Sequence, residues 1–239
     1  MRIVFSSLEP AFSHQYIIES CSERYGNYTA RTQAHFYDQA QQSPNAPRVA
    51  RVYEVFDDGR SSTYLVMEFL SAPSFEVLIN AAGSSPECES LRATAIFPRV
   101  DSIGPVGGGN IQHIFFNMEE APIAFATSGA LETYVNKALS SLPGKIKHCV
   151  TLTTEARLYC PSDVAFRNFL WDGKVVSFVD WQHVNLLPQS FASYYFHSTA
   201  DKVVKAVASR ISLQRSTKLK LIDAAARQGA SRGGFRTTI

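Results

Sequence analysis

Two short apolar runs around a turn signal constrain the fold of this chain most strongly. They lie in the stretch CPSDVAFRNFLWDGKVVSFVDW, at residues 169–171 and 175–179, and flank Asp-Gly-Lys. This pattern is typical of a tight β-hairpin with a type I′ turn. Because a tight hairpin brings the ends of its strands together, Asn168, which enters it, and Asp180, which leaves it, are expected to be neighbours.

The polar side chains at the ends of this hairpin allow two interpretations. Side-by-side oxygens from Asn168 and Asp180 would suit Mg²⁺, which prefers a few carboxylate or amide oxygens together with water and phosphate. Asp163, one loop earlier, could then hold an acceptor hydroxyl for in-line attack. Asn and Asp are also common turn residues, so an ordinary hairpin with polar ends is the alternative.

The rest of the chain predicts a small unit followed by a larger one. In the first unit, residues 1–69, we expect a helix at about 30–42 and a β-hairpin at about 48–69 around the turn signal DDGR. The second unit, residues 70–239, contains the segment 160–181 and mostly helical patterns, including one at 128–142. This order predicts an α+β protein with two lobes.

Composition places the chain among globular proteins. Apolar residues make up 45% of the 239 residues and charged residues 18%. The N-terminal residues have only a three-residue apolar run before serines and an acid, which is too short for a signal peptide. A transmembrane helix needs about 18 consecutive apolar residues, and no apolar run in the sequence approaches that length. A cytoplasmic protein without a membrane partner is therefore expected.

Positive charge gathers at the C-terminal end of the sequence. Residues 201–239 hold nine Lys and Arg against two Asp. Such an end could bind nucleic acid or an anionic surface. Its cations are spread over all helical faces without interleaved aromatic residues, which favours a solvated basic helix over a nucleic-acid partner.

The catalytic-type segment resembles that of the protein-kinase-like fold. The pattern is D-x-x-x-x-N from Asp163 to Asn168, then a hairpin, then Asp180 followed by Trp. The Asp-Trp variant is similar to the aminoglycoside phosphotransferase and choline kinase group of small-molecule kinases. The stretch RNFLWDGKVVSFVDWQHVNLLPQSF is similar to fungal phosphotransferase-like members of this group. The resemblance covers roughly residues 30–200, and the catalytic segment is its specific part.

This resemblance implies an ATP- and Mg²⁺-dependent phosphotransferase that acts on a small-molecule hydroxyl. In that interpretation Asp163 orients and deprotonates the acceptor, and Asn168 and Asp180 hold Mg²⁺. Arg167 could place positive charge near the transferring phosphoryl group, or it could form a salt bridge that supports its loop.

The resemblance also implies a nucleotide-binding segment in the first unit. The stretch RVARVYEVFDDGRSSTYLVMEFL is similar to the fourth and fifth strands and the hinge of the kinase-like fold. Met67 would then guard the pocket, and the backbone from Glu68 through Phe69 to Leu70 would face the adenine.

The sequence departs from the kinase-like pattern in the first unit. The fold's phosphate-gripping lysine lies on the strand before the first helix and pairs with a glutamate on that helix, whereas no lysine precedes Lys137 here. Arg24 or Arg31 could substitute, and Gln33 falls near the glutamate position. A Gly-rich strand pair is also missing, with only Gly26 before the helix, so the first two strands are expected to be shortened or absent. These departures imply a degenerate or truncated N-lobe. The alternative function is therefore that of a catalytically inactive domain that binds a ligand or a protein.

Overall fold

The computed structural model describes residues 2–6, 15–44, 46–82, 103–143, 148–210 and 213–231. The chain divides into two compact units. Unit 1 comprises Met1–Thr94 and Ala165–Gln182, and unit 2 comprises Ala95–Val164 and His183–Ile239. The hairpin segment that the sequence analysis assigned to the larger lobe therefore belongs to unit 1, while the boundary near residue 70 stays a prediction.

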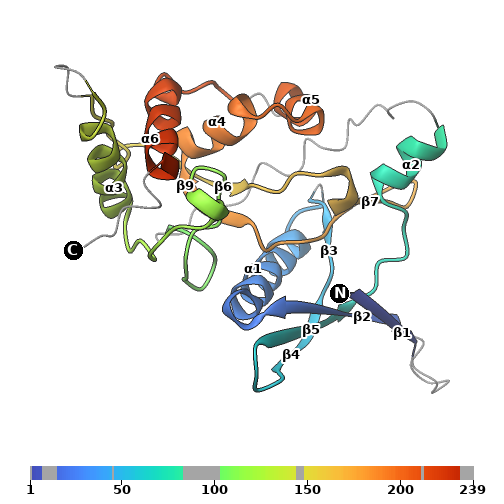
Figure 1. Cartoon of the computed structure of the whole chain (residues 1–239). Helices are drawn as coiled ribbons and strands as arrows, with labels where there is room; N and C mark the ends of the chain where they lie inside the picture. The colour runs from blue at the N-terminus through green and yellow to red at the C-terminus, as the bar shows by residue number, and fades with distance from the viewer. Residues whose placement is uncertain are drawn as a thin grey trace. The chain divides into compact units, whose positions relative to one another are not determined.

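Unit 1 contains a four-stranded antiparallel sheet with the order β1-β2-β5-β4 (Figure 1). Its strands are β1 (Arg2–Ser6), β2 (Gln15–Ser22), β4 (Val52–Asp57) and β5 (Ser62–Glu68). The central strand β5 alternates buried and half-buried residues, with Thr63, Leu65 and Met67 on the buried face. The first two strands were expected to be shortened or absent. Both are present, and β2 is eight residues long and pairs along the whole of β5, so the expectation of absence is wrong.

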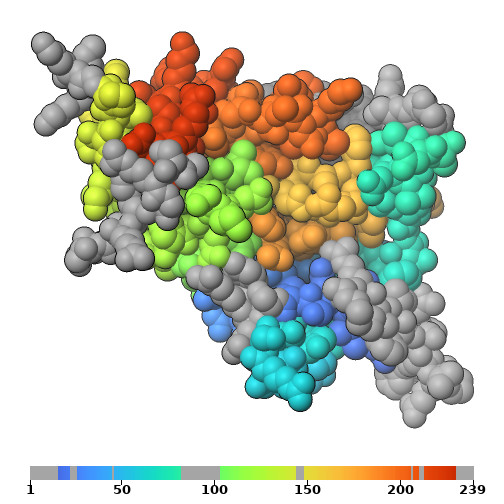
Figure 2. Space-filling model, in the orientation of Figure 1, coloured from blue at the N-terminus to red at the C-terminus, as the bar shows by residue number. Residues whose placement is uncertain are grey.

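The β4–β5 connection forms where the sequence carries DDGR. The Asp58 carboxylate accepts hydrogen bonds from the amides of Arg60, Ser61 and Ser62 at 2.8, 3.0 and 3.1 Å. Gly59 has a φ of 70°, a conformation that glycine adopts at little cost. The hairpin (cyan) is exposed on the face of the molecule seen in Figure 2.

Helix α1 (Glu23–Gln41) packs against β5, β4 and β2 of this sheet. It begins earlier than residue 30, where the periodicity of apolar residues indicated a start. Gly26, a poor helix former, interrupts the pattern in the first turns. The glycine is needed there, because a Cβ at Gly26 would lie 2.2 Å from the Cβ of Thr63 on β5.

The second sheet of unit 1 has the order β3-β8-β7. In it β3 (Arg48–Val49) lies parallel to β8 (Val176–Phe178), which pairs antiparallel with β7 (Phe169–Trp171). The turn is not the expected type I′, because among residues 172–175 only Gly173 has a positive φ, of 95°. The Asp172 carboxylate instead accepts from the amides of Lys174 and Val175, both at 2.8 Å. The hairpin also contacts the residues just before helix α2 (Phe75–Ala82), because the Trp171 amide donates to the Pro73 carbonyl at 3.0 Å.

Among the described residues of unit 2, helices predominate over strands, which form the antiparallel pair β6 (Arg157–Pro161) and β9 (Val184–Pro188). The described helices are the 3₁₀ turn η2 (Asn117–Glu119), α3 (Ser128–Ser140), α4 (Gln189–Ser198), α5 (Lys202–Arg210) and α6 (Leu219–Ser231). Figure 1 shows α3 and α6 side by side, and α4 is buried along most of its length. No helix in the described part of the chain is long and apolar enough to cross a membrane.

Candidate nucleotide pocket and catalytic segment

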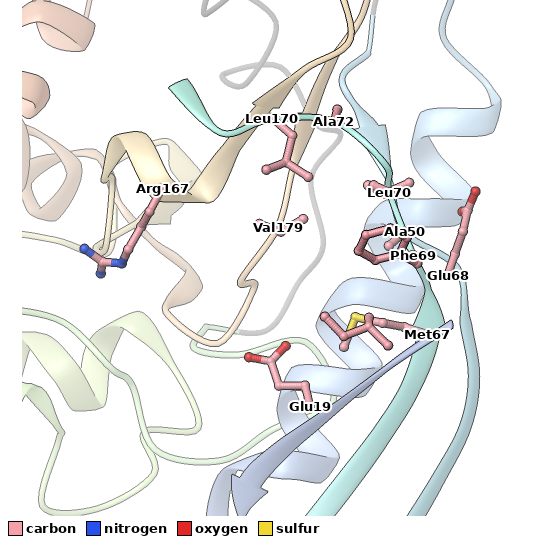
Figure 3. A pocket seen from close by; sticks show the side chains of 11 residues that line it. Glu19, Ala50, Met67, Glu68, Phe69, Leu70, Ala72, Arg167, Leu170 and Val179 are labelled. Carbon is pink, nitrogen blue, oxygen red and sulfur yellow. The ribbon is translucent and has the colours of Figure 1, made fainter. Parts of the chain in front are cut away.

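A pocket of about 190 Å³ opens in unit 1 between the sheet and the β7–β8 hairpin (Figure 3). Its lining is mainly apolar, with Ile17 from β2 and Leu170 and Val179 from the hairpin segment. These three side chains pack against the buried cluster of unit 1, which includes Ala30, Ala50, Leu65, Met67 and Leu70. The pocket is therefore an opening in a packed core, as is common for small-molecule sites.

All four residues predicted to contact a nucleotide, Met67 to Leu70, line this pocket. Met67 is buried and its side chain points into the pocket, whereas the Glu68 carboxylate points away from it (Figure 3). Glu68 forms an ion pair with Arg48, and its amide donates to the Arg51 carbonyl at 2.8 Å. Within the described residues no partner is found for the amide of Leu70, while its carbonyl accepts from Ala72 at 2.9 Å. This amide could donate to a ring nitrogen.

The glutamate position implied for the first helix is occupied by a buried Gln33. Its Nε2 atom donates to the Ala50 carbonyl at 2.9 Å and to the Met67 Sδ at 3.4 Å. Gln33 thus holds the pocket wall in place and forms no ion pair. Of the two candidate substitutes for the lysine, Arg31 is exposed and does not line the pocket, and the side chain of Arg24 lies outside the described residues.

Sequence reasoning missed Glu19, the charged residue that β2 presents to the pocket. Ile17 and Glu19 are two residues apart, so both lie on the same face of this strand. Register confirms the placement, since Ile17 is opposite Met67 and Glu19 is opposite Leu65. The alternation in QYIIES could have revealed this position, but β2 was expected to be shortened or absent. A carboxylate therefore stands on the strand where the kinase-like pattern has a lysine.

The structure brings Asn168 and Asp180 together at the ends of the hairpin. The Val179 amide donates to the Asn168 carbonyl at 3.0 Å, one step beyond the Phe169–Phe178 pair. Asn168 is 1% exposed, and Asp180 has a φ of 69°, which is unusual for a residue other than glycine. Such strained residues persist where the surrounding structure over-determines them, often at functional sites.

Arg167 precedes Asn168 on the 3₁₀ turn η3 (Phe166–Asn168) and lines the pocket. It is exposed, and Figure 3 shows its guanidinium directed away from Met67 and the other hinge residues. Glu68 forms an ion pair with Arg48. The other two charged residues of the lining, Arg167 and Glu19, have opposite charges.

Asp163 belongs to unit 2 and lies in a loop that is anchored on both sides. The Ser162 hydroxyl donates to the Gln112 carbonyl at 2.7 Å, and the Ser162 amide donates to the His183 carbonyl at 3.0 Å. After Asp163, the Val164 amide donates to the Tyr195 hydroxyl at 2.7 Å. Burial raises the pKa of Tyr195 above its ordinary value, so this phenol stays neutral. The Asp163 backbone is therefore fixed by neighbours from three other segments.

The donor set around the hairpin meets the needs of Mg²⁺ only together with a nucleotide. No group of three or more His, Cys, Asp or Glu side chains gathers as a metal site among the described residues. Asn168 and Asp180 supply two side-chain oxygens, which suits Mg²⁺ because this ion keeps water and phosphate ligands. The pair fits a shared nucleotide–metal site and does not fit an all-protein cage.

Comparison with known proteins supports the fold. No family model and no curated protein matches the sequence. Among solved structures, a thermostable mutant of aminoglycoside phosphotransferase APH(4)-Ia in a ternary complex with AMP-PNP and hygromycin B aligns with a TM-score of 0.54 and 16% identity, over 97% of this chain and 84% of that chain. The apo form of that enzyme aligns with a TM-score of 0.53 and 16% identity, over 98% and 88%.

The chain has an α+β, two-lobed protein-kinase-like fold. This confirms the fold class that the sequence predicted. At such low identity the likeness establishes architecture alone, because one fold hosts many functions.

Proposed function

We propose that this protein is an ATP- and Mg²⁺-dependent phosphotransferase that acts on a small-molecule hydroxyl, in the manner of the aminoglycoside phosphotransferase and choline kinase group. The observation that carries the proposal is the position of Asn168 and Asp180 at the two ends of the hairpin, where the amide of Val179, the residue before Asp180, donates to the Asn168 carbonyl. Val179 and Arg167 both line the pocket, so Asp180 and Asn168 are each next in sequence to a residue of the lining.

The nucleotide ring would lie on the hinge from Met67 to Leu70, against the apolar side chains of Ile17, Leu170 and Val179. The Leu70 amide would provide a hydrogen bond to the ring. Related structures of APH(4)-Ia contain AMP-PNP or ADP together with hygromycin B. These complexes support a nucleotide and a small-molecule acceptor as the two ligands proposed for this chain.

The phosphate end would depend on residues of the hairpin segment. Asn168 and Asp180 would hold Mg²⁺, which when bound offsets the negative charge of the phosphates. Arg167 would add positive charge at the transferring group. Asp163 would orient the acceptor hydroxyl and take its proton while the γ-phosphoryl group passes to the hydroxyl oxygen and ADP leaves.

A second candidate function, ligand binding without catalysis, is favoured by the lining of the pocket. Glu19 is a carboxylate on the strand where a lysine would grip phosphate, and Gln33 is engaged with Ala50 and Met67. A nucleoside or another small ring could bind such a pocket without phosphoryl transfer.

Transfer assays separate the two functions. Pure protein is incubated with ATP, Mg²⁺ and a panel of small-molecule alcohols that includes aminoglycosides, and ADP and phosphorylated acceptor are measured by mass spectrometry. The first function predicts acceptor-dependent ADP formation that is lost in Asp163→Asn. ATP binding without transfer to any acceptor would favour the binding-only function.

A further inference from the structure

The charge of the pocket lining suggests which ligands this site accepts. Three charged side chains line it, Glu19, Glu68 and Arg167. Glu68 is paired with Arg48 and points away, whereas Figure 3 shows the carboxylate of Glu19 extending from β2 toward the hairpin side of the pocket. No lysine lines the pocket in the part of the chain that the structure describes.

A carboxylate in this position acts differently on the two ends of a nucleotide. The ring end contacts apolar side chains and backbone groups of residues 67–70. Because the ring is uncharged, the charge of Glu19 has little effect on its binding. Phosphates carry negative charge, and a unit charge a few ångströms away repels each of them in a partly desolvated site. Specificity is often obtained through such a repulsive element against the unwanted ligand.

We propose that Glu19 determines the phosphate specificity of this pocket. Its charge lowers the affinity of the free triphosphate relative to an uncharged nucleoside and makes triphosphate binding depend more strongly on Mg²⁺. The inference rests on the proposed function in one respect, namely that the pocket holds the ring of a nucleotide. It does not require Glu19 to lack protein partners, because the test measures how the ratio of two ligand affinities changes.

Calorimetric titration of adenosine, ADP and ATP, each with Mg²⁺ and with EDTA, tests the inference on wild type, Glu19→Gln and Glu54→Gln. Glu54 is an exposed residue of β4 outside the pocket lining and serves as the matched control. In EDTA, Glu19→Gln is expected to bind ATP about tenfold more tightly than wild type, the size expected for one nearby unit charge. Adenosine affinity should stay within about twofold, and Glu54→Gln should behave as wild type.

A salt titration of wild type and Glu19→Gln provides a second readout. Salt screens both the repulsion from Glu19 and the attraction to Arg167, so a higher ionic strength in EDTA should weaken ATP relative to adenosine more in Glu19→Gln than in wild type. If the wild type binds adenosine but the ratio of ATP affinity to adenosine affinity is the same in Glu19→Gln as in wild type, the inference is overturned. The proposed function would still stand. Absence of adenosine and ATP binding in every protein would overturn the proposed nucleotide site itself, and this inference with it.

Discussion

The ring of Phe36 on α1 stacks against the indole of Trp181, with 4.4 Å between the ring centroids and 23° between the ring planes. Trp181 directly follows Asp180, whose φ of 69° is costly for a residue with a side chain. The indole also donates to the Phe178 carbonyl at 3.1 Å. The packing of α1 against the hairpin segment therefore holds the candidate metal ligand in its strained conformation.

Removing this stack should destabilise unit 1. Both side chains are almost completely buried, so Trp181→Ala or Phe36→Ala is expected to lower the free energy of unfolding by about 3–5 kcal/mol. Val77→Ala, at an exposed position on α2, should change it by less than about 0.5 kcal/mol. Urea denaturation followed by circular dichroism measures the difference. Equal stabilities of Phe36→Ala and Val77→Ala would contradict the role given to the stack.

Gly26 should tolerate no side chain, although it lies in a helix. In Gly26→Ala the new Cβ meets Thr63 on β5, and the expected loss of unfolding free energy is about 1–3 kcal/mol despite the better helix propensity of alanine. A Cβ at Gly229 on α6 would have no neighbour within 4 Å, so Gly229→Ala should stabilise the protein by about 0.5–1 kcal/mol. Thermal or urea unfolding of both variants checks the opposite signs. Two changes of the same sign would contradict the close packing of α1 on β5.

The sequence predicted local structure well where short-range chemistry determines it. The turns at Asp58–Ser62 and Asp172–Val175 occur where DDGR and DGK indicated, because an aspartate accepts from amides two to four residues away. It failed for β2, whose pairing partner β5 is distant in sequence, and for the start of α1, because Gly26 breaks the helical pattern where it packs against Thr63. That contact is far away in sequence and leaves no local signal.

The candidate site was predictable in part for the same reason. Asn168 and Asp180 flank a single hairpin, so their proximity follows from the turn. Glu19 was missed because its place in the lining depends on the pairing of β2 with β5, which connects distant residues. The anchoring of the Asp163 loop by Tyr195 is equally long-range and could not be inferred from spacing.

Stability should fall in mild acid because of His113. This residue of unit 2 is fully buried, and burial lowers the pKa of its imidazole from 6.5 to about 3, partly opposed by the Phe191 carbonyl. Between pH 6.5 and 3 the unfolded chain takes up a proton that the folded protein does not. The contribution of His113 is therefore complete above pH 6.5 and is lost as the pH falls, by about 1.4 kcal/mol per pH unit.

Unfolding free energies measured between about pH 7 and pH 5 check this slope. His113→Asn removes the titrating group and keeps an acceptor for the Phe115 amide, so its slope should be smaller than that of the wild type. His148 is exposed, and His148→Gln should retain the wild-type slope. A wild-type slope in His113→Asn would show that other groups cause the acid sensitivity.

A cluster around Glu155 should stabilise unit 2. Its carboxylate accepts from the Ser190 amide at 2.8 Å, from the Ser190 hydroxyl at 2.6 Å and from the Lys218 Nζ at 2.6 Å. Glu155→Ala leaves these partly buried donors without their acceptor, and a loss of about 2–4 kcal/mol of unfolding free energy is expected. Lys220→Gln, at an exposed position on α6, is the control. A Glu155→Ala protein as stable as this control would refute the role of the cluster.

The central claim is a Mg²⁺–nucleotide site built on the hairpin, and calorimetric titration of ATP with and without Mg²⁺ tests it most directly. The decisive variant is Asp180→Gly, which removes the carboxylate and accommodates the positive φ without strain. Asp38→Asn, at an exposed position on α1, is the control. The account predicts Mg²⁺-dependent binding in wild type and Asp38→Asn, and its loss in Asp180→Gly. Mg²⁺-dependent binding of equal strength in Asp180→Gly, or no binding in the wild type, would contradict it.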